Sequence, residues 1–499
     1  MKNGPYTYSH YKEQMQKIAD IKYAAAVLQW DQETYLPQKG NHWRGQQIST
    51  LSELAHNIFT SEGTRSIIQG LLDNNQLNEK EKRNVELSWE DYQRNFKIPS
   101  AFVKELSVTI NKSYHDWIEA RKENDFKKFQ HSLTKIVEMK KKEADLLGYN
   151  DHPYSALMND YDKGLTVETT DRIFSDLSKK LLPILDLVKN KQQVENKFLH
   201  KRFDKNKQWE FGLGLLKNMH FDFEAGRQDI SEHPFTTNFN SADVRVTTRI
   251  DEHDLANMVW SCIHEGGHAL YEQGLPFEEY GMPLGEYCSL SIHESQSRLW
   301  ENCIGRSLEY WQYHYPLLQS YFPEALSNID VLSFYKGINR IEPSLIRTEA
   351  DELTYHFHVI IRYEIEKKLI EGSIQTKDIP AIWEEYYMKY LGIKVPDDKR
   401  GCLQDVHWSH GSFGYFATYS IGSLYAAQFW DKIKSENPKA VIEIKSGNSS
   451  FIHHWLKKEI YSYGRKFSSS QLCKNATGDN LQSDYFINYL KSKIISIYD

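Results

Sequence analysis

Apolar residues recur every three or four positions along most of the chain, which is the spacing of one face of a helix. Four stretches show this pattern most clearly, at 8–30, 251–276, 289–311 and 341–372. In the last of them, one stripe holds seven apolar residues: Ile346, Ala350, Leu353, Phe357, Ile361, Ile365 and Leu369. A proline near its start and a glycine at its end are typical helix boundaries. We therefore predict helices in these four stretches.

The period changes to two at 242–250. Val244, Val246 and Thr248 alternate there with polar residues, which predicts a β-strand. The chain has no repeat, low-complexity tract or obvious linker. We expect an all-α fold in the sense of a mainly helical protein with a few short strands, forming a single domain over residues 1–499.

The composition narrows the class of protein. A net charge of −7 without a long basic run argues against a nucleic-acid partner. No apolar stretch reaches about 18 residues, so no membrane span is predicted. Residues 1–20 are polar and lack the apolar core of a signal peptide. The five cysteines are odd in number and irregularly spaced, which predicts free thiols and a cytoplasmic location.

A candidate metal motif lies in the middle of the 251–276 helix. His264 and His268 are four residues apart, so both imidazoles project from one helix face and can bind one ion. Glu265 points about 60° away from the direction of His268, where a carboxylate can take a proton from water activated by the metal. Composition alone gives the pattern about one chance in ten of arising somewhere in such a chain. The helical context raises the odds, because two histidines in an apolar helix need partners.

Two adjacent glycines, Gly266 and Gly267, lie between the histidines. Each costs about 1 kcal/mol relative to alanine in a helix interior, so their presence needs a reason. One reason is close packing against another helix. The other is room for a substrate backbone beside the metal, and the two are compatible.

A catalytic zinc usually has three protein ligands. Glu272 lies four residues past His268, but three such residues on one straight helix span about 12 Å, too far for bonds of about 2 Å. The third ligand must therefore come from another element. The 289–311 stretch offers Glu294 and Glu301, seven residues apart and on nearly the same face, and also His293. Periodicity does not choose between the two glutamates, and an ion pair of Glu294 with Arg298 is the plainer alternative.

Six motifs in one order resemble the carboxypeptidase Taq family of metallocarboxypeptidases, over essentially the whole chain. They are SEHPF at 231–235, DVRVT at 243–247, HEGGHALYEQG at 264–274, IHESQSRLWEN at 292–302, IRTEADELTY at 346–355 and GCLQDVHW at 401–408. The resemblance implies a metal site of His264, His268 and Glu294, with Glu265 as catalytic acid and base. It also implies a deep central groove, broad specificity and a homodimer.

The implied reaction removes C-terminal residues from peptides. Zn²⁺ is the expected ion, although Co²⁺ or Mn²⁺ suits the same ligands. The segment QDVHWSHGSFGYFATY offers His407, Tyr415 and Tyr419 as donors to the developing oxyanion. Aromatic-rich segments usually form core, but the resemblance favours an active-site role for His407 and Tyr415 and leaves Tyr419 undecided. His410 is unusual within this segment and close enough to His407 to alter its pKa.

A carboxypeptidase must also bind a terminal carboxylate, for which the planar guanidinium of arginine is suited. Arg245 and Arg347 lie inside motifs that the resemblance places around the terminal residue of the substrate. The plainer alternative for Arg245 is an ion pair with Asp243 or Asp251. For Arg347 it is an ion pair with Asp351.

Two other classes of function remain open at this point. A zinc oligopeptidase or aminopeptidase would use the same metal motif and would differ in which peptide end it needs free. A binding or scaffold protein without turnover would more often have lost one of the four residues of the motif and its third ligand.

Overall fold

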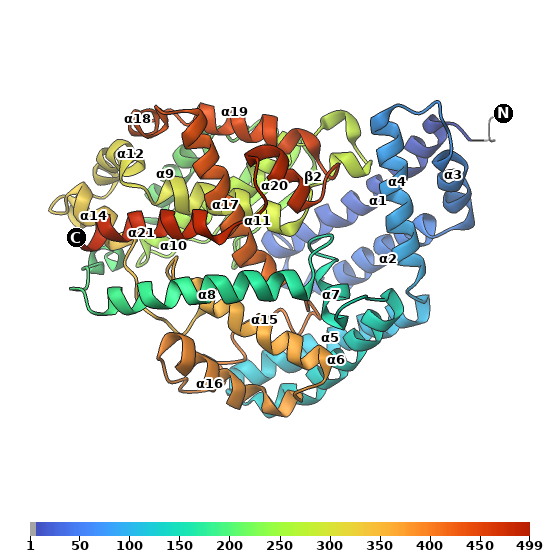
Figure 1. Cartoon of the computed structure of the whole chain (residues 1–499), viewed down its shortest axis with the longest axis horizontal. Coiled ribbons are helices and arrows are strands. Elements are labelled where there is room, and N and C mark those ends of the chain that lie inside the picture. The colour runs from blue at the N-terminus through green and yellow to red at the C-terminus, as the bar shows by residue number, and fades with distance from the viewer. Residues whose placement is uncertain (1–5) are drawn as a thin grey trace. The chain divides into compact units, whose positions relative to one another are not determined.

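The structure is a computed structural model that describes residues 6–499, most of which are helical (Figure 1). The chain divides into two compact units, each assembled from separated stretches. Unit 1 comprises the described residues up to Phe96, Glu195–Ile338 and Gln428–Asn480, and unit 2 comprises Lys97–Val194, Asn339–Ala427 and Leu481–Asp499. The predicted helical class is confirmed, because the part of the chain described contains only three short strands.

Unit 1 contains the sheet and most of the helices. Its helices are α1 (Tyr8–Thr34), α2 (Asn41–Phe59), α3 (Glu62–Leu72), α4 (Glu79–Phe96), α9 (Lys205–Asn218), α10 (Leu255–Gly274), α11 (Leu290–Arg298), α12 (Leu308–Tyr321), α13 (Pro323–Leu326), α14 (Val331–Ile338), α18 (Ala440–Lys445), α19 (Ser450–Glu459) and α20 (Ser469–Thr477). In Figure 1, α1 lies beside α2, and α3 packs against α4.

Unit 2 contains helices and no strand among its described residues. Its helices are α5 (Ser100–Glu123), α6 (Phe126–Leu147), α7 (Pro153–Met158), α8 (Val167–Lys189), α15 (Tyr355–Glu371), α16 (Ile379–Leu391) and α21 (Ser483–Tyr498). The pairs α5–α6, α8–α21 and α15–α16 pack against each other. Helix α17 (Phe416–Glu436) contributes residues to both units.

The three strands form one sheet in the order β1 (Gly226–Ile230), β3 (Asp243–Thr248), β2 (Thr236–Asn240). The central strand β3 is parallel to β1 and antiparallel to β2, and it coincides with the predicted strand. Val244 and Val246 are fully buried, as their alternation predicts. Helix α10 packs against β3 and β2, so the sheet supports the helix that carries the metal motif.

The two glycines of the motif face neighbouring helices. A Cβ atom on Gly267 would lie 2.7 Å from the backbone oxygen of Gln296 and 2.7 Å from the Cα of Ser297 in α11. A Cβ on Gly266 would meet only side-chain ends, at 2.7 Å from Leu216 and 2.9 Å from Met219. Close packing therefore accounts for both glycines, and the alternative of room for a substrate backbone is not supported at either.

The predicted helix at 341–372 begins later than its apolar stripe suggests. Helix α15 starts at Tyr355, and Arg347–Glu349 form only a short 3₁₀ turn. The carboxylate of Asp351 accepts hydrogen bonds from the backbone N–H groups of Leu353 and Thr354, both at 2.9 Å. Such local side-chain bonds compete with helix formation. Leu353 is buried although it lies in a loop, so its place in the apolar stripe wrongly predicted a helix at this position.

The predicted helix at 289–311 is also interrupted. A π-helix at Leu299–Gly305 lies between α11 and α12. A π-helix winds with more residues per turn than an α-helix, so the seven-residue spacing of Glu294 and Glu301 does not by itself fix their relative directions.

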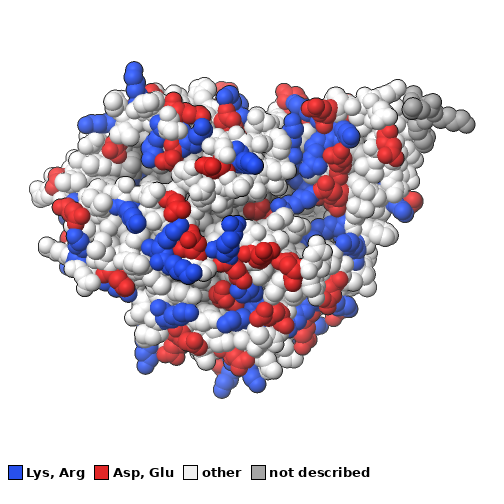
Figure 2. All heavy atoms as spheres, in the orientation of Figure 1, with Lys and Arg blue, Asp and Glu red and all other residues white. Residues whose placement is uncertain are grey.

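Three further features concern the cysteines, the helices and the surface charge. All five cysteines are free thiols, as predicted. None of the helices within residues 6–499 combines the length and the apolar character needed to cross a membrane. Figure 2 shows acidic and basic side chains interspersed over the visible face, without a broad patch of one sign there.

Gly267→Ala should destabilise the protein by about 1–3 kcal/mol, because its methyl group would press on the backbone of α11, which cannot turn aside. Gly266→Ala is the matched control, since it meets flexible side-chain ends and gains about 1 kcal/mol of helix propensity. Chemical unfolding of both metal-free variants measures the difference. Equal stability of the two variants would contradict the packing account.

Candidate metal centre and neighbouring charged cluster

Three side chains of unit 1 converge on one point. Oε2 of Glu294 lies 3.4 Å from Nε2 of His268 and 3.7 Å from Nε2 of His264. One ligand atom from each of the three residues lies within 4.8 Å of the others. The histidines come from consecutive turns of α10 and the carboxylate from α11, so the packing of these two helices at Gly267 brings the set together.

The three donors fit a divalent metal. Metal–ligand bonds of about 2.0–2.1 Å in a tetrahedron place neighbouring ligand atoms about 3.3 Å apart, close to the separations observed. Two imidazole nitrogens and one carboxylate are also the chemical set of a catalytic zinc site, in which a fourth position stays open for water or substrate.

Burial and neighbouring charges keep Glu294 and His268 in the protonation state that a metal needs. Burial opposes the charged form of Glu294, but Arg298 and His264 outweigh it and hold the pKa of this carboxyl below its usual range. Arg298 donates from Nε to Oε1 of Glu294 at 2.7 Å, which leaves Oε2 directed at the histidines. Burial, reinforced by the neighbouring His293, lowers the pKa of His268 to about 3, so this imidazole is neutral. The predicted pair of Glu294 with Arg298 therefore coexists with the metal-binding geometry.

Glu301 contacts the second ring nitrogen of His264, Nδ1. Its Oε2 lies 2.8 Å from Nδ1 of His264, on the opposite side of the ring from Glu294. Arg298 and Arg306 donate to its two oxygens, at 3.2 Å and 3.3 Å. Burial opposes the charge of His264, yet Glu294 and Glu301 together raise its pKa. The geometry thus gives the two glutamates that periodicity left open different positions, one facing Nε2 and the other facing Nδ1.

Glu265 is buried beside the triad. The hydroxyl of Thr236 on β2 donates to one of its carboxylate oxygens at 2.6 Å. Burial raises the pKa of this carboxyl above its ordinary value. A raised pKa makes a carboxylate a better proton acceptor near neutral pH, which is the property of a general base.

Arg245 forms the ion pair with Asp243 that its strand position suggests. Nε and Nη2 each donate to one oxygen of Asp243, both at 2.9 Å. The guanidinium also lies 4.3 Å from the ring centroid of Trp30 and 4.8 Å from that of Phe239. These contacts fix the orientation of Arg245, and its binding of a substrate carboxylate stays a prediction.

Arg347 belongs to a buried charged cluster in unit 2. The alternative pair with Asp351 is wrong, because Arg347 binds Asp405 instead, from Nε at 2.9 Å and from Nη2 at 2.8 Å. Arg362 donates to the other oxygen of Asp405 at 2.6 Å. Two guanidinium groups therefore share one carboxylate, which leaves the cluster with an excess positive charge suited to an anionic ligand.

His407 and the tyrosines lie beside this cluster. Nε2 of His407 is 3.0 Å from the hydroxyl of Tyr419, and its ring centroid is 5.5 Å from that of Tyr415. Burial and the charge of Arg347 lower the pKa of His407 to about 3. Its Nδ1 is buried without a hydrogen-bond partner among residues 6–499, the kind of orphaned group that often marks a functional site. His410 also lowers the pKa of His407, by less than burial and Arg347 do.

Glu366 of α15 anchors the loop that carries His407 and Tyr415. The indole N–H of Trp408 donates to one of its oxygens at 2.8 Å. The backbone N–H of Gly414 donates to the other at 2.9 Å, and the hydroxyl of Tyr154 adds a third hydrogen bond. Despite these donors, burial raises the pKa of Glu366 to about 7.

Several supporting residues escaped the sequence analysis. Asp405 is 58 residues from Arg347, so no local spacing rule connects them. His293 and Glu272 were weighed only as ligands, yet they contact each other and reach His268 through the ring of His293. For Glu301, the seven-residue spacing gave a face but neither the π-helix in which it lies nor its contact with Nδ1 of His264.

Comparison with known proteins assigns the chain to a family. Residues 10–494 match the carboxypeptidase Taq (M32) metallopeptidase family. Carboxypeptidase 1 of Bacillus subtilis is 37% identical over 486 residues, covering 97% of each chain. The crystal structure of the M32 carboxypeptidase from Deinococcus radiodurans superimposes with a TM-score of 0.96 at 35% identity, over 98% of this chain and 99% of that one. Thermostable carboxypeptidase 1 of Pyrococcus furiosus is 35% identical over 96% of each chain.

The buried Glu366 should make the stability of the folded chain depend on pH. An unfolded glutamate has a pKa of about 4.3, so between about pH 4.3 and 7 the folded state holds a proton that the unfolded state has lost. The contribution of this group is therefore fully present at low pH and is lost as the pH rises, by about 4 kcal/mol in total.

Glu366→Gln should remove that part of the slope, because the amide does not titrate. Urea unfolding of the wild type and the variant between pH 5 and 8 measures it. Identical slopes in the two proteins would show that Glu366 does not titrate in this range.

Proposed function

Because the chain belongs to the carboxypeptidase Taq (M32) metallopeptidase family and is a metal-dependent carboxypeptidase, we propose that His264, His268 and Glu294 hold its catalytic metal. The observation that carries this proposal is the convergence of the three donors on one point. We infer Zn²⁺ as the ion, on the strength of two imidazole nitrogens and one carboxylate, and Co²⁺ or Mn²⁺ suits the same set. The family assignment favours this activity over the oligopeptidase, aminopeptidase and scaffold alternatives.

A divalent metal at this position supplies a Lewis acid that polarises the scissile carbonyl and makes water nucleophilic. Glu265 accepts the proton of the attacking water and delivers it to the nitrogen of the leaving amino acid. The hydrogen bond from Thr236 holds one oxygen of Glu265 in place, which keeps the carboxylate beside the two histidines. Burial raises the pKa of Glu265, which makes this carboxylate a better proton acceptor.

The remaining assignments stay predictions of the family resemblance. They are His407 and Tyr415 as donors to the substrate carbonyl, and Arg245 and Arg347 as groups that bind the terminal carboxylate. The excess positive charge around Asp405 supports the role of Arg347. The cytoplasmic location and the homodimer also stay predictions.

We infer that the two compact units form one catalytic domain over residues 1–499. The chain passes from one unit to the other five times, once within α17. Units interleaved in this way do not correspond to two domains joined by a single linker.

A peptide with a free C-terminus should be shortened stepwise, whereas its C-terminal amide should be nearly inert. The amide loses charge-assisted hydrogen bonds of about 1.5–3 kcal/mol each and turns an N–H donor toward guanidinium donors. The combined loss of about 3–5 kcal/mol lowers kcat/KM by roughly a few hundred to a few thousand-fold. Mass spectrometry of the products over time measures the cleavage.

The matched control is the same peptide acetylated at its N-terminus, which should be cleaved at the rate of the unmodified peptide. Equal cleavage of amide and acid would favour an oligopeptidase. Loss of cleavage on acetylation would favour an aminopeptidase.

Glu265→Gln should keep the metal and lose turnover, because the amide preserves the shape of the side chain but accepts no proton. Metal content by mass spectrometry and kcat on one peptide separate the two properties. Loss of metal from this variant would identify Glu265 as a ligand and overturn its role as general base.

A further inference from the structure

His268 has an unusual partner on the far side of its ring. Nδ1 of His268 lies 2.6 Å from Nδ1 of His293, and Nε2 of His293 lies 2.7 Å from Oε1 of Glu272. The side chains of His293 and Glu272 are 13% and 4% exposed, so water does not substitute for these contacts. The ring of His293 is also packed against Tyr271 and Tyr287, with centroids 5.5 Å and 4.9 Å away.

A metal bound at Nε2 of His268 would fix the place of each proton in this series. If Nε2 of His268 offers its lone pair to a metal, the proton of the neutral ring is on Nδ1. Nδ1 of His293 must then accept that proton's hydrogen bond, which puts the proton of His293 on Nε2. That N–H donates to Glu272, a carboxylate that only accepts. One orientation of donors and acceptors therefore satisfies the whole series.

The same two helices provide the ligands and their support. Glu272 lies four residues past His268 on α10, and His293 directly precedes Glu294 on α11. Glu272 is thus the third member of a face that begins with His264, and it is linked to the metal centre through one imidazole.

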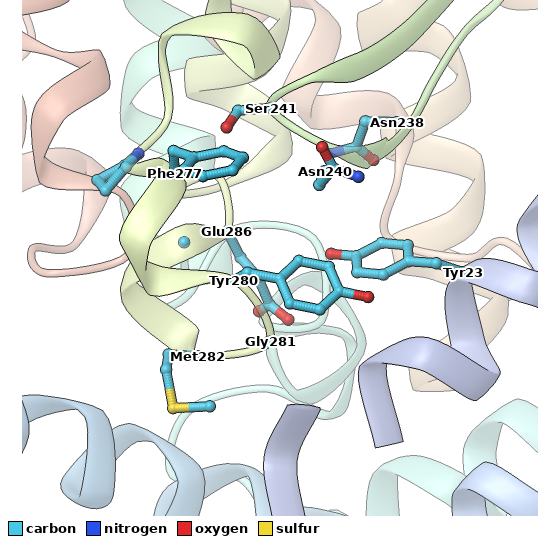
Figure 3. A pocket seen from close by; sticks show the side chains of 11 residues that line it. Tyr23, Asn238, Asn240, Ser241, Phe277, Tyr280, Gly281, Met282 and Glu286 are labelled. Atoms are coloured by element: carbon cyan, nitrogen blue, oxygen red, sulfur yellow. The ribbon is translucent and has the colours of Figure 1, made fainter. Parts of the chain in front are cut away.

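The second oxygen of Glu272 is held from the sheet. Nδ2 of Asn238, on β2, donates to Oε2 of Glu272. Asn238 also lines a small pocket together with Tyr23 and Tyr280, and Figure 3 shows these side chains around it. The series therefore ends at a fixed amide and not in bulk solvent.

The two proposed ligand histidines therefore contact a carboxylate in different ways. His264 contacts Glu301 directly, and two arginines bind that carboxylate. His268 reaches Glu272 only through His293, and the hydrogen-bond partners of Glu272 are the uncharged amide of Asn238 and the ring of His293. A carboxylate in direct contact raises the basicity of a ligating imidazole more than one placed a residue away.

We propose that His293 and Glu272 are positioning residues for the metal: they fix the tautomer and the ring orientation of His268 so that its Nε2 faces Glu294 and His264. This inference rests on the proposed metal site. Outer partners of this kind typically change metal affinity by about 10–100-fold. We call the series His268–His293–Glu272 the histidine relay.

The test measures metal affinity directly. Each purified variant is stripped of metal and titrated with Zn²⁺ in competition with a chromophoric chelator, and with Co²⁺ by its visible spectrum. His293→Ala should weaken Zn²⁺ binding by about 10–100-fold and change the Co²⁺ spectrum. His293→Asn should recover much of the affinity, because Oδ1 of asparagine takes the place of the accepting Nδ1.

His314→Ala is the matched control for loss of a buried imidazole in unit 1. His314 lies on α12 and is 5% exposed, and its Nε2 is 3.2 Å from Oδ1 of Asn218. Its replacement should lower the melting temperature of the metal-free protein and leave Zn²⁺ affinity at the wild-type value.

Glu294→Ala separates failure of the histidine relay from failure of the metal site. Wild-type Zn²⁺ affinity in His293→Ala, with loss in Glu294→Ala, would overturn the relay alone. Wild-type affinity in Glu294→Ala would overturn the metal site itself. An equal loss of Zn²⁺ affinity in His293→Ala and His293→Asn would also contradict the relay. The hydrogen-bond acceptor that asparagine provides would then not have recovered any affinity.

Discussion

The close approach of α10 and α11 at Gly267 is the contact on which the candidate metal centre depends. A single Cβ at this position would lie 2.7 Å from two backbone atoms of α11. Only because that atom is absent does Glu294 come within 3.4 Å and 3.7 Å of the two imidazoles. The loss of helix propensity at the glycines, about 1 kcal/mol each, is offset by the packing of a buried interface that also sets the geometry of a site.

Charge compensation lets this interface hold so many ionisable groups. Glu294 and Glu301 are buried carboxylates, and isolated burial of either would favour protonation. Arg298 contacts both of them, and Arg306 contacts Glu301, so their pKa values fall below the usual range. Unit 2 has a different balance, because Arg347 and Arg362 share the single carboxylate of Asp405. The excess positive charge favours an anion near this second cluster, whereas two carboxylates and two arginines balance in the first.

Residue spacing predicted the elements and part of the site. The four-residue spacing of His264 and His268 and the alternation around Val244 identify local geometry, which backbone periodicity alone determines. The choice between Glu294 and Glu301 was beyond it, because both carboxylates contact His264 and only the fold shows which ring nitrogen each one faces. Before helix α15 the spacing predicted a helix that does not form. The apolar stripe continues there through a loop that Asp351 organises with its own hydrogen bonds. Long-range partners such as Asp405 had no local signal at all.

The central claim is that His264, His268 and Glu294 together bind one catalytic metal ion. Anomalous diffraction from crystals of the active protein, collected above and below the absorption edge of its bound metal, locates that ion directly. The account predicts one peak within about 2.0–2.2 Å of Nε2 of both histidines and an oxygen of Glu294. A peak bound by Glu265 or Glu301 in place of Glu294, or an active protein with no peak at this position, would contradict it.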